Sequence, residues 1–201
     1  MSRIKASDTV RPVIDAAPGA DVHPGLDLAN SLLFAPGGVV TDLLDSPAAA
    51  TAWLAERGLV PADAVLHEIC ARRLRALRSA LRDLFTAAVR PEPPPAEALA
   101  AVNAALTRVP TTAELHWDQA GGWHRTVPHP TDQVVDHALG VLAADAADLL
   151  TGADAGRLAA CDSRPCRRFL LRGGRRQWCS VRCGDRARAA RAYARRSTGD
   201  H

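Results

Sequence analysis

The C-terminal fifth of the chain reads CDSRPCRRFLLRGGRRQWCSVRCGDRARAARAYARR (residues 161–196) and carries four of its five cysteines. Cys161 and Cys166 are separated by four residues, Cys179 and Cys183 by three, and twelve residues lie between the pairs. Four thiolates at this spacing can surround one Zn²⁺ tetrahedrally. A short segment with few apolar residues needs such a crosslink to stay folded. The stretch therefore predicts a small module built around one zinc ion.

The four predicted ligands are all cysteines, which indicates a closed, structural site. A catalytic zinc would keep one position open for water or substrate. Two disulfides, unpaired thiols and an iron–sulfur cluster are the alternatives that the spacing leaves. The odd number of cysteines favours a reducing compartment over a disulfide framework, and we expect the protein in the cytoplasm.

The charge of the chain is strongly asymmetric. Residues 157–196 contain 13 Arg against Asp162 and Asp185, a net charge of +11, whereas residues 1–156 carry −7. Four thiolates and one Zn²⁺ would lower the charge of the tail to about +9. An acidic region followed by a basic one points to a polyanionic partner for the tail. The exclusive use of Arg there also fits a GC-rich genome, but the net charge does not depend on that choice.

Local signals predict a knuckle, a β-hairpin and a helix within this module. Pro165 lies in the knuckle between the first two cysteines, and Gly173-Gly174 suits a tight turn. Ser180 is placed to cap a helix whose first turn delivers Cys183. The expected elements are a knuckle at 161–166, strands at 167–171 and 175–178, and a helix over 181–196. This order describes a treble-clef-like zinc finger.

The arginines of this module are the candidates for nucleic-acid contact. Basic side chains on a short helix suit phosphate contacts or entry into a groove, without revealing a sequence preference. The predicted nucleic-acid-binding residues are Arg167, Arg168, Arg175, Arg176, Arg182, Arg186, Arg188, Arg191 and Arg195.

Upstream, the sequence predicts a mainly α-helical domain over 23–156 with one small β-hairpin, after a disordered segment over 1–22. Apolar residues recur at steps of three and four along 62–89, which indicates a long amphipathic helix. Arginines on another face of that helix, at 72, 75, 78 and 82, are read as a solvated face or as a second phosphate-binding surface. The remaining expectations are helices over 23–34, 46–58, 96–108 and 131–150 (with Thr131 as its N-cap), a hairpin over 112–128 and a linker over 151–156.

Other functional classes have little support. The seven histidines show no metal-ligand spacing, and the chain lacks a glycine-rich phosphate loop and a nucleophile elbow, so we expect no enzyme. No run approaches the roughly 20 apolar residues that cross a bilayer, so no membrane partner is expected. Asp27 and Asn30 share a helical face near His23 and could line a ligand pocket, although helix capping and surface hydrogen bonds explain them as well.

The final stretch, WCSVRCGDRARAARAYARR (178–196), resembles the CGNR zinc-finger signature, with Asp185 in place of the family's asparagine. Four upstream stretches are similar to the helical ABATE domain that precedes this finger in actinobacterial proteins described as stress-induced transcription regulators: LDLANSL (26–32), WLAERGL (53–59), LRALRSALRDLF (74–85) and AVNAALTRV (101–109). The resemblance implies a CGNR finger over 157–201, zinc on the four cysteines and nucleic-acid contact near Arg186. A carboxylate at 185 would repel a phosphate or change the accepted base.

These observations favour a zinc-dependent DNA-binding protein, a transcription regulator whose helical domain serves sensing or dimerisation. A homodimer would suit palindromic sites. The alternative is a zinc-finger module that binds proteins or RNA without sequence-specific DNA recognition.

Overall fold

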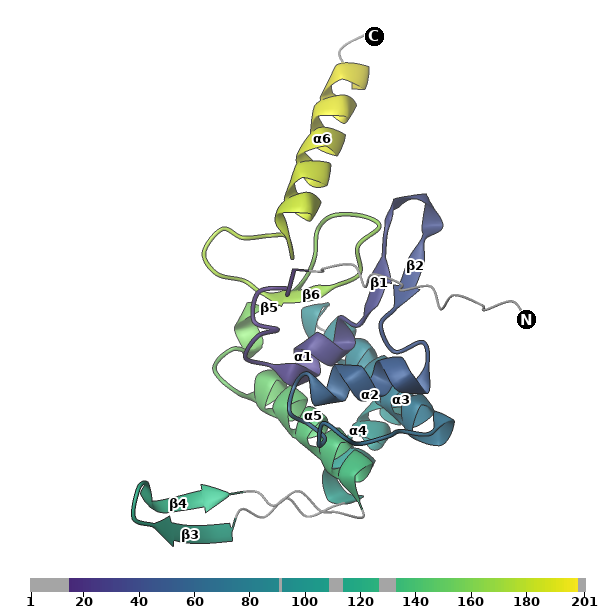
Figure 1. Cartoon of the computed structure of the whole chain (residues 1–201). Coiled ribbons are helices and arrows are strands. Elements are labelled where there is room, and N and C mark those ends of the chain that lie inside the picture. Colours follow the sequence, from purple (N-terminus) through teal and green to yellow (C-terminus); the bar gives the residue numbers. More distant parts are fainter. Residues whose placement is uncertain (1–14, 91, 109–113, 127–132, 199–201) are drawn as a thin grey trace, which may run out of the picture.

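The computed structural model describes residues 15–90, 92–108, 114–126 and 133–198. Figure 1 shows a helical body (residues 23–156) and, at one end of it, the finger (residues 157–198), whose last helix points away from the body. A β-hairpin lies at the opposite end (Figure 1). The predicted class, mainly helical with a C-terminal four-cysteine module, is confirmed. In the described residues the helical domain carries two small β-hairpins where the sequence predicts one.

The long helix α3 (Glu68–Val89) is the centre of the body. Its buried side chains include Leu74, Leu77, Leu81 and Phe85, at the three- and four-residue steps of an amphipathic helix. The helix begins six residues later than the pattern predicts. Pro61 starts a turn there, in which the Ala64 N–H donates to the Pro61 carbonyl.

Four further helices surround α3. Both α4 (Ala96–Arg108) and α5 (Val134–Thr151) pack against α3 and against each other, and α1 (Pro24–Ala29) lies on α3 and α5. The short α2 (Pro47–Ala55) is capped by the Ser46 hydroxyl, which accepts a hydrogen bond from the Ala49 N–H as the sequence predicts. The predicted N-cap Thr131 lies outside the described residues. None of the helices in the described ranges is long and apolar enough to cross a membrane.

The first expected helix differs from the structure. The sequence predicts a helix over 23–34, but α1 ends at Ala29 and the chain continues as strand β1 (Leu32–Phe34). This strand pairs antiparallel with β2 (Val40–Asp42) through a turn that contains the short 3₁₀ helix η1 (Pro36–Gly38). Gly37 and Gly38 have φ angles of 77° and 76°, which suit glycine in a tight return. Leu32–Phe34 is a short apolar run, and such a run does not distinguish strand from helix.

The second hairpin, β3 (Glu114–Asp118) with β4 (Gly122–Thr126), confirms the prediction over 112–128. Trp117 faces Trp123 across the two strands, and both side chains are exposed.

The finger is built differently from the predicted knuckle-then-hairpin arrangement. Strand β6 (Phe169–Leu171) pairs antiparallel with β5 (Leu158–Ala160), which lies before the first cysteine. Residues 175–178, expected as a second strand, run as turn and irregular backbone. The first cysteine pair therefore lies within the loop of the β-hairpin. A short 3₁₀ helix, η2 (Ala155–Arg157), precedes β5, and α6 (Val181–Thr198) follows Ser180 as predicted.

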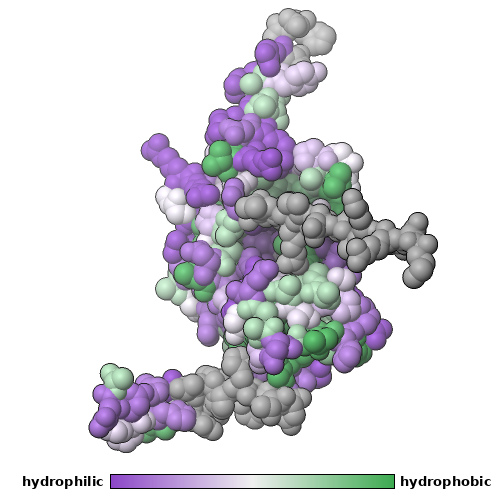
Figure 2. Space-filling model, viewed as in Figure 1, coloured by the Kyte–Doolittle hydropathy of each residue, from purple (hydrophilic) through white to green (hydrophobic). Residues whose placement is uncertain are grey.

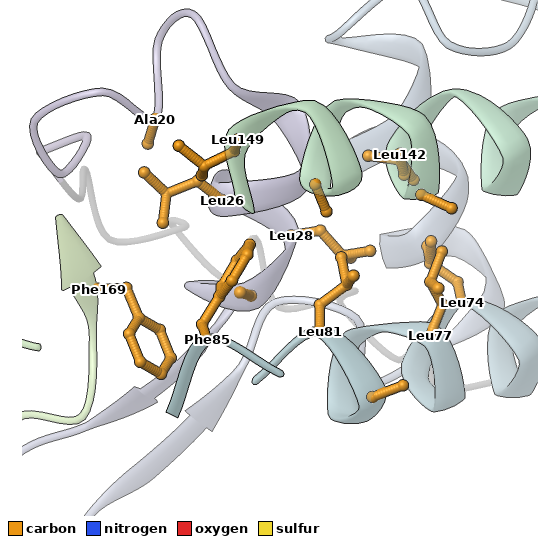
Figure 3. Close-up of a cluster of buried hydrophobic side chains, with 14 of the residues drawn as sticks. Ala20, Leu26, Leu28, Leu74, Leu77, Leu81, Phe85, Leu142, Leu149 and Phe169 are labelled. Carbon is orange, nitrogen blue, oxygen red and sulfur yellow. The ribbon is translucent and has the colours of Figure 1, made fainter. Parts of the chain in front are cut away.

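The body and the finger share one hydrophobic core. Figure 3 shows it as a row of side chains that runs from Leu142 of α5 through Leu81 and Phe85 of α3 to Phe169 of β6. The Phe85 and Phe169 rings meet edge to face, with centroids 5.6 Å apart and planes inclined by 69°. Such a pair contributes about 0.5–1.5 kcal/mol beyond its buried area. The finger is thus packed onto the end of α3.

The segment before α1 also contacts the finger. The sequence assigns 1–22 to a disordered segment; residues 1–14 lie outside the described part, and residues 15–22 pack against β6. Ala17 and Ala20 are buried, and the Pro18 carbonyl accepts a hydrogen bond of 2.8 Å from the Leu171 N–H. Gly19 has a φ of 89°, and a Cβ there would lie 2.6 Å from the Leu171 side chain. This close approach is open to glycine alone.

Candidate metal centre and basic helix

The first cysteine pair is held by the β5–β6 hairpin. Cys161 follows β5 directly, and its N–H donates to the Arg168 carbonyl at 2.8 Å across the base of the loop. The Cys166 N–H donates to the Ser163 carbonyl at 2.8 Å. These two bonds turn the loop back on itself.

The second pair sits at the start of α6. The Ser180 hydroxyl accepts a hydrogen bond of 3.2 Å from the Cys183 N–H, which is the predicted N-cap. The Cys179 N–H points at the Cys161 sulfur over 3.5 Å, so the two pairs are joined directly. Gly184 follows Cys183, and a Cβ there would lie 3.1 Å from the Trp178 ring, so glycine lets the helix pass close to that ring.

The four sulfur atoms fit one metal ion. All lie within 4.8 Å of one another, and the Cys166–Cys179 and Cys179–Cys183 separations are each 3.6 Å. Zn–S bonds of about 2.3 Å in a tetrahedron require S···S separations of about 3.8 Å. A disulfide would need about 2.05 Å. Cys161, Cys166, Cys179 and Cys183 are therefore positioned to hold one structural Zn²⁺, and the fifth cysteine, Cys70, packs against the core of the body.

Crowding separates the pKa values of these thiols. Hydrogen bonds with Cys166 and Cys179 lower the pKa of Cys161 to about 2, and the bond to Cys161 raises the pKa of Cys166 to about 12. The hydrogen bonds with Cys161 and Cys166 also raise the pKa of Cys179. Four thiolates confined to this space repel one another, and a bound dication removes that repulsion.

The predicted nucleic-acid-binding arginines fall into two groups. Arg168 is buried and Arg186 is half-buried, and both side chains reach toward cysteine sulfurs. The others are exposed: Arg167, Arg175, Arg176, Arg182, Arg188, Arg191 and Arg195. Figure 2 shows hydrophilic side chains gathered along much of α6, the segment that extends beyond the rest of the molecule.

Asp185, the residue that departs from the CGNR signature, has a partner within α6. Its carboxylate accepts a hydrogen bond of 2.6 Å from Arg188, three residues later. Arg188 and Arg191 also approach the Trp178 ring, with guanidinium carbons 5.6 Å and 5.5 Å from its centroid. Asp185 therefore neutralises part of the basic surface of the helix.

The arginines of α3 are mostly turned inward. Only Arg72 of the four is exposed. Arg78 is 5% exposed and binds the Asp42 carboxylate of β2, with one N···O distance of 2.7 Å. Arg75 donates to the Leu44 carbonyl, and Arg82 donates to the carbonyls of Ala29 and Arg167. The readings of this face as solvated or as phosphate-binding are wrong for these three residues, which join the body to its loops and to the finger.

Asp27 and Asn30, the candidate ligand-pocket residues, border a cleft of about 380 Å³ that also involves Arg57 and Arg168. Asp27 forms an ion pair of 2.6 Å with Arg57. Asn30 is buried, and its amide bonds both backbone groups of Phe169: it donates to the carbonyl at 2.9 Å and accepts from the N–H at 2.8 Å. Asn30 thus acts as one more strand partner for β6, a role that no local sequence signal indicates.

Comparison with known families agrees with this arrangement. Residues 22–153 match the ABATE family, described as "Putative stress-induced transcription regulator", and residues 157–196 match the CGNR zinc finger. A search of curated proteins finds no match. The chain belongs to the ABATE family and carries a CGNR zinc finger with four cysteines placed around one metal site.

Proposed function

We propose that the protein is a zinc-dependent DNA-binding transcription regulator. The observation that carries the proposal is the exposed basic surface of α6, which projects from a metal-held base. Arg182, Arg188, Arg191 and Arg195 are exposed on this helix and belong to a region of net charge +11. A cationic helix that extends into solvent can follow phosphates or enter a groove.

In this proposal the body does not touch DNA and has a regulatory role, as a sensor or a dimerisation domain. It is acidic, with −7 over residues 1–156, so phosphates are repelled from it and directed to the finger. The cleft beside Asp27 and Asn30 is the candidate effector site, because Asn30 holds β6 and could pass a change to the finger. Both matched families are of regulator or zinc-finger type, which supports a non-enzymatic role.

A second function has one observation in its favour. Asp185 and Asp162 pair with Arg188 and Arg191 on the same face, and carboxylates on a basic surface lower its affinity for phosphate. Such a mixed surface suits a partly acidic protein. The alternative is therefore a module that binds proteins or RNA.

The deciding experiment compares the full chain with Cys179→Ser in a genomic pull-down followed by sequencing. A DNA-binding regulator enriches discrete sites that disappear in the variant. Recovery of the same protein partners from both nuclease-treated and untreated lysates, with no enriched sites, would favour the interaction module.

A binding assay with purified protein tests the basic surface directly. Replacement of Arg188, Arg191 and Arg195 by Gln should weaken binding to duplex DNA and make log K less dependent on log salt, by up to about 0.9 per lost phosphate contact. Arg72→Gln is the matched control, since Arg72 is an exposed arginine on α3 of the body. An equal effect of both changes would contradict the assignment to α6.

A further inference from the structure

Two arginines of the finger are aimed at its sulfur atoms. In Arg186, Nη2 lies 3.1 Å from the Cys183 Sγ, and Nε donates to the Ser163 hydroxyl at 3.1 Å. The spacing of three residues on α6 brings the guanidinium back over the cysteine. Ser163 is 2% exposed, so this second contact fixes the plane of the guanidinium against the knuckle.

Arg168, the residue before β6, reaches a different sulfur of the site. Its side chain is buried, with the residue 8% exposed, and Nη1 lies 3.9 Å from the Cys179 Sγ. Nη2 donates to the Asp15 carbonyl at 2.9 Å. A guanidinium cannot lose its charge, so its burial is costly unless an anion lies close by. The Cys179 sulfur is an anion of this kind when it binds a metal.

The charges of the site then balance. One Zn²⁺ with four thiolates carries a net charge of about −2, and two guanidinium groups supply about +2. The Cys161 Sγ faces an uncharged peptide group, the Cys179 N–H, at 3.5 Å. Charge-assisted hydrogen bonds are roughly twice as strong as neutral ones. They also draw electron density from the sulfur, and partners behind metal ligands fix the orientation of those ligands.

We propose that Arg168 and Arg186 serve the metal and do not contact nucleic acid: each donates to a zinc-bound thiolate, neutralises the site and slows the loss of zinc. Arg186 is the last residue of the CGNR tetrad. The resemblance places it near DNA, whereas the present proposal gives it a role at the metal. It leaves the seven exposed arginines as the phosphate-facing set.

The first test measures zinc release from the full chain to a chromophoric chelator. Arg186→Gln should release zinc on the order of 10–100-fold more readily, the usual effect of losing a partner behind a ligand. Arg182→Gln is the matched control, because Arg182 lies on the first turn of the same helix and is exposed. It should release zinc at the rate of the parent protein. Equal rates for Arg186→Gln and the parent, or equal acceleration in both variants, would overturn the proposal.

The second test separates electronic contact from simple packing. In the Co²⁺-substituted protein, loss of a hydrogen bond to sulfur should move the thiolate-to-cobalt charge-transfer band to lower energy in Arg186→Gln and leave it in place in Arg182→Gln. Arg186→Lys covers the case in which the Gln variant does not fold, because it keeps the charge and loses the second contact to Ser163. It should show an intermediate shift and release rate. A Lys variant identical to the parent in both would refute the role.

A third measurement asks whether Arg186 meets phosphate. With zinc in excess, Arg182→Gln should reduce the salt dependence of binding to duplex DNA, whereas Arg186→Gln should leave it unchanged. A reduced salt dependence in Arg186→Gln would mean that this side chain contacts the nucleic acid. If neither protein binds DNA, the proposed function fails, and the zinc-release and cobalt results still decide the proposal about the two arginines.

Discussion

The body and the finger are stabilised by different interactions. The body surrounds α3 with helices and buries residues such as Leu74, Leu81 and Phe85 completely or nearly so. The finger has two three-residue strands, and four cysteines converge where a core would otherwise be needed. The body is therefore stabilised by apolar area, and the finger by a metal together with the surface of the body on which it packs. The two regions should therefore respond to different perturbations.

The largest expected effect comes from removing zinc with a chelator or by Cys179→Ser. A structural zinc site in small fingers is worth about 10–16 kcal/mol of apparent binding energy, so the finger should lose its structure. The body should remain folded, because the packing of α1, α4 and α5 on α3 does not depend on the metal. Hydrogen exchange would show fast exchange over 157–198 and continued protection in α3 and α5. Loss of protection in both regions would mean that the body also depends on the metal for its stability.

Next in size is Leu81→Ala, which perturbs the body alone. Leu81 is fully buried in α3, and such truncations cost about 2–5 kcal/mol. Urea unfolding followed by helical circular dichroism should give this loss with the m-value unchanged. Zinc content of the folded protein should stay at one per chain. If the variant loses zinc as well as stability, the finger needs an intact body in order to hold the metal.

The variant Asn30→Ala tests the contact between the body and the finger. The variant leaves the buried N–H and C=O of Phe169 without their side-chain partner, at a cost of about 1–3 kcal/mol for an unsatisfied group. We expect exchange protection of β6 to fall while the metal remains bound. Asn30→Asp serves as a comparison, since it keeps the acceptor for the Phe169 N–H and loses the donor. Unchanged protection of β6 in both variants would exclude a role for Asn30 in docking.

The smallest effect concerns acid stability of the body. Burial would raise the pKa of Asp42, but hydrogen bonds from Arg78 and the Leu44 N–H and the nearby positive charges hold it below its ordinary value of 3.8. A carboxylate with a lowered native pKa stabilises the fold above its unfolded pKa, and this contribution is lost as pH falls through the native pKa.

Urea unfolding of Cys179→Ser at pH 6 and at successively lower values, down to pH 3, measures the effect of Asp42 without zinc. Addition of Asp42→Asn should lower stability at pH 6 and reduce the further loss in acid. Parallel pH curves for the two proteins would rule out Asp42 as a source of the acid dependence.

Local signals in the sequence were sufficient for much of this fold. The apolar stripe of α3, the Ser46 and Ser180 caps, the β3–β4 hairpin and the cysteine spacing each depend on residues close together in the chain. Because covalent neighbours determine caps, turns and helical faces, these features could be predicted without knowledge of the tertiary structure.

Features that depend on distant residues were missed. Gly173-Gly174 suggested a hairpin after β6, but β6 pairs with β5, a strand of only three residues without alternation. The nine arginines predicted to bind nucleic acid are chemically identical, and only packing shows that Arg168 and Arg186 face sulfur. Asn30 looked like a surface or pocket residue because its partner is 139 positions away.

The shared core has a practical consequence for engineering. β6 is buried along its whole length, with Phe169 against Phe85 and Leu171 against the segment that begins at Ala17. An isolated finger that begins at residue 157 would present this strand to water and invite self-association. The finger is therefore not an independent unit. A chimera that carries it would also need the end of α3 and Asn30, which contact β6.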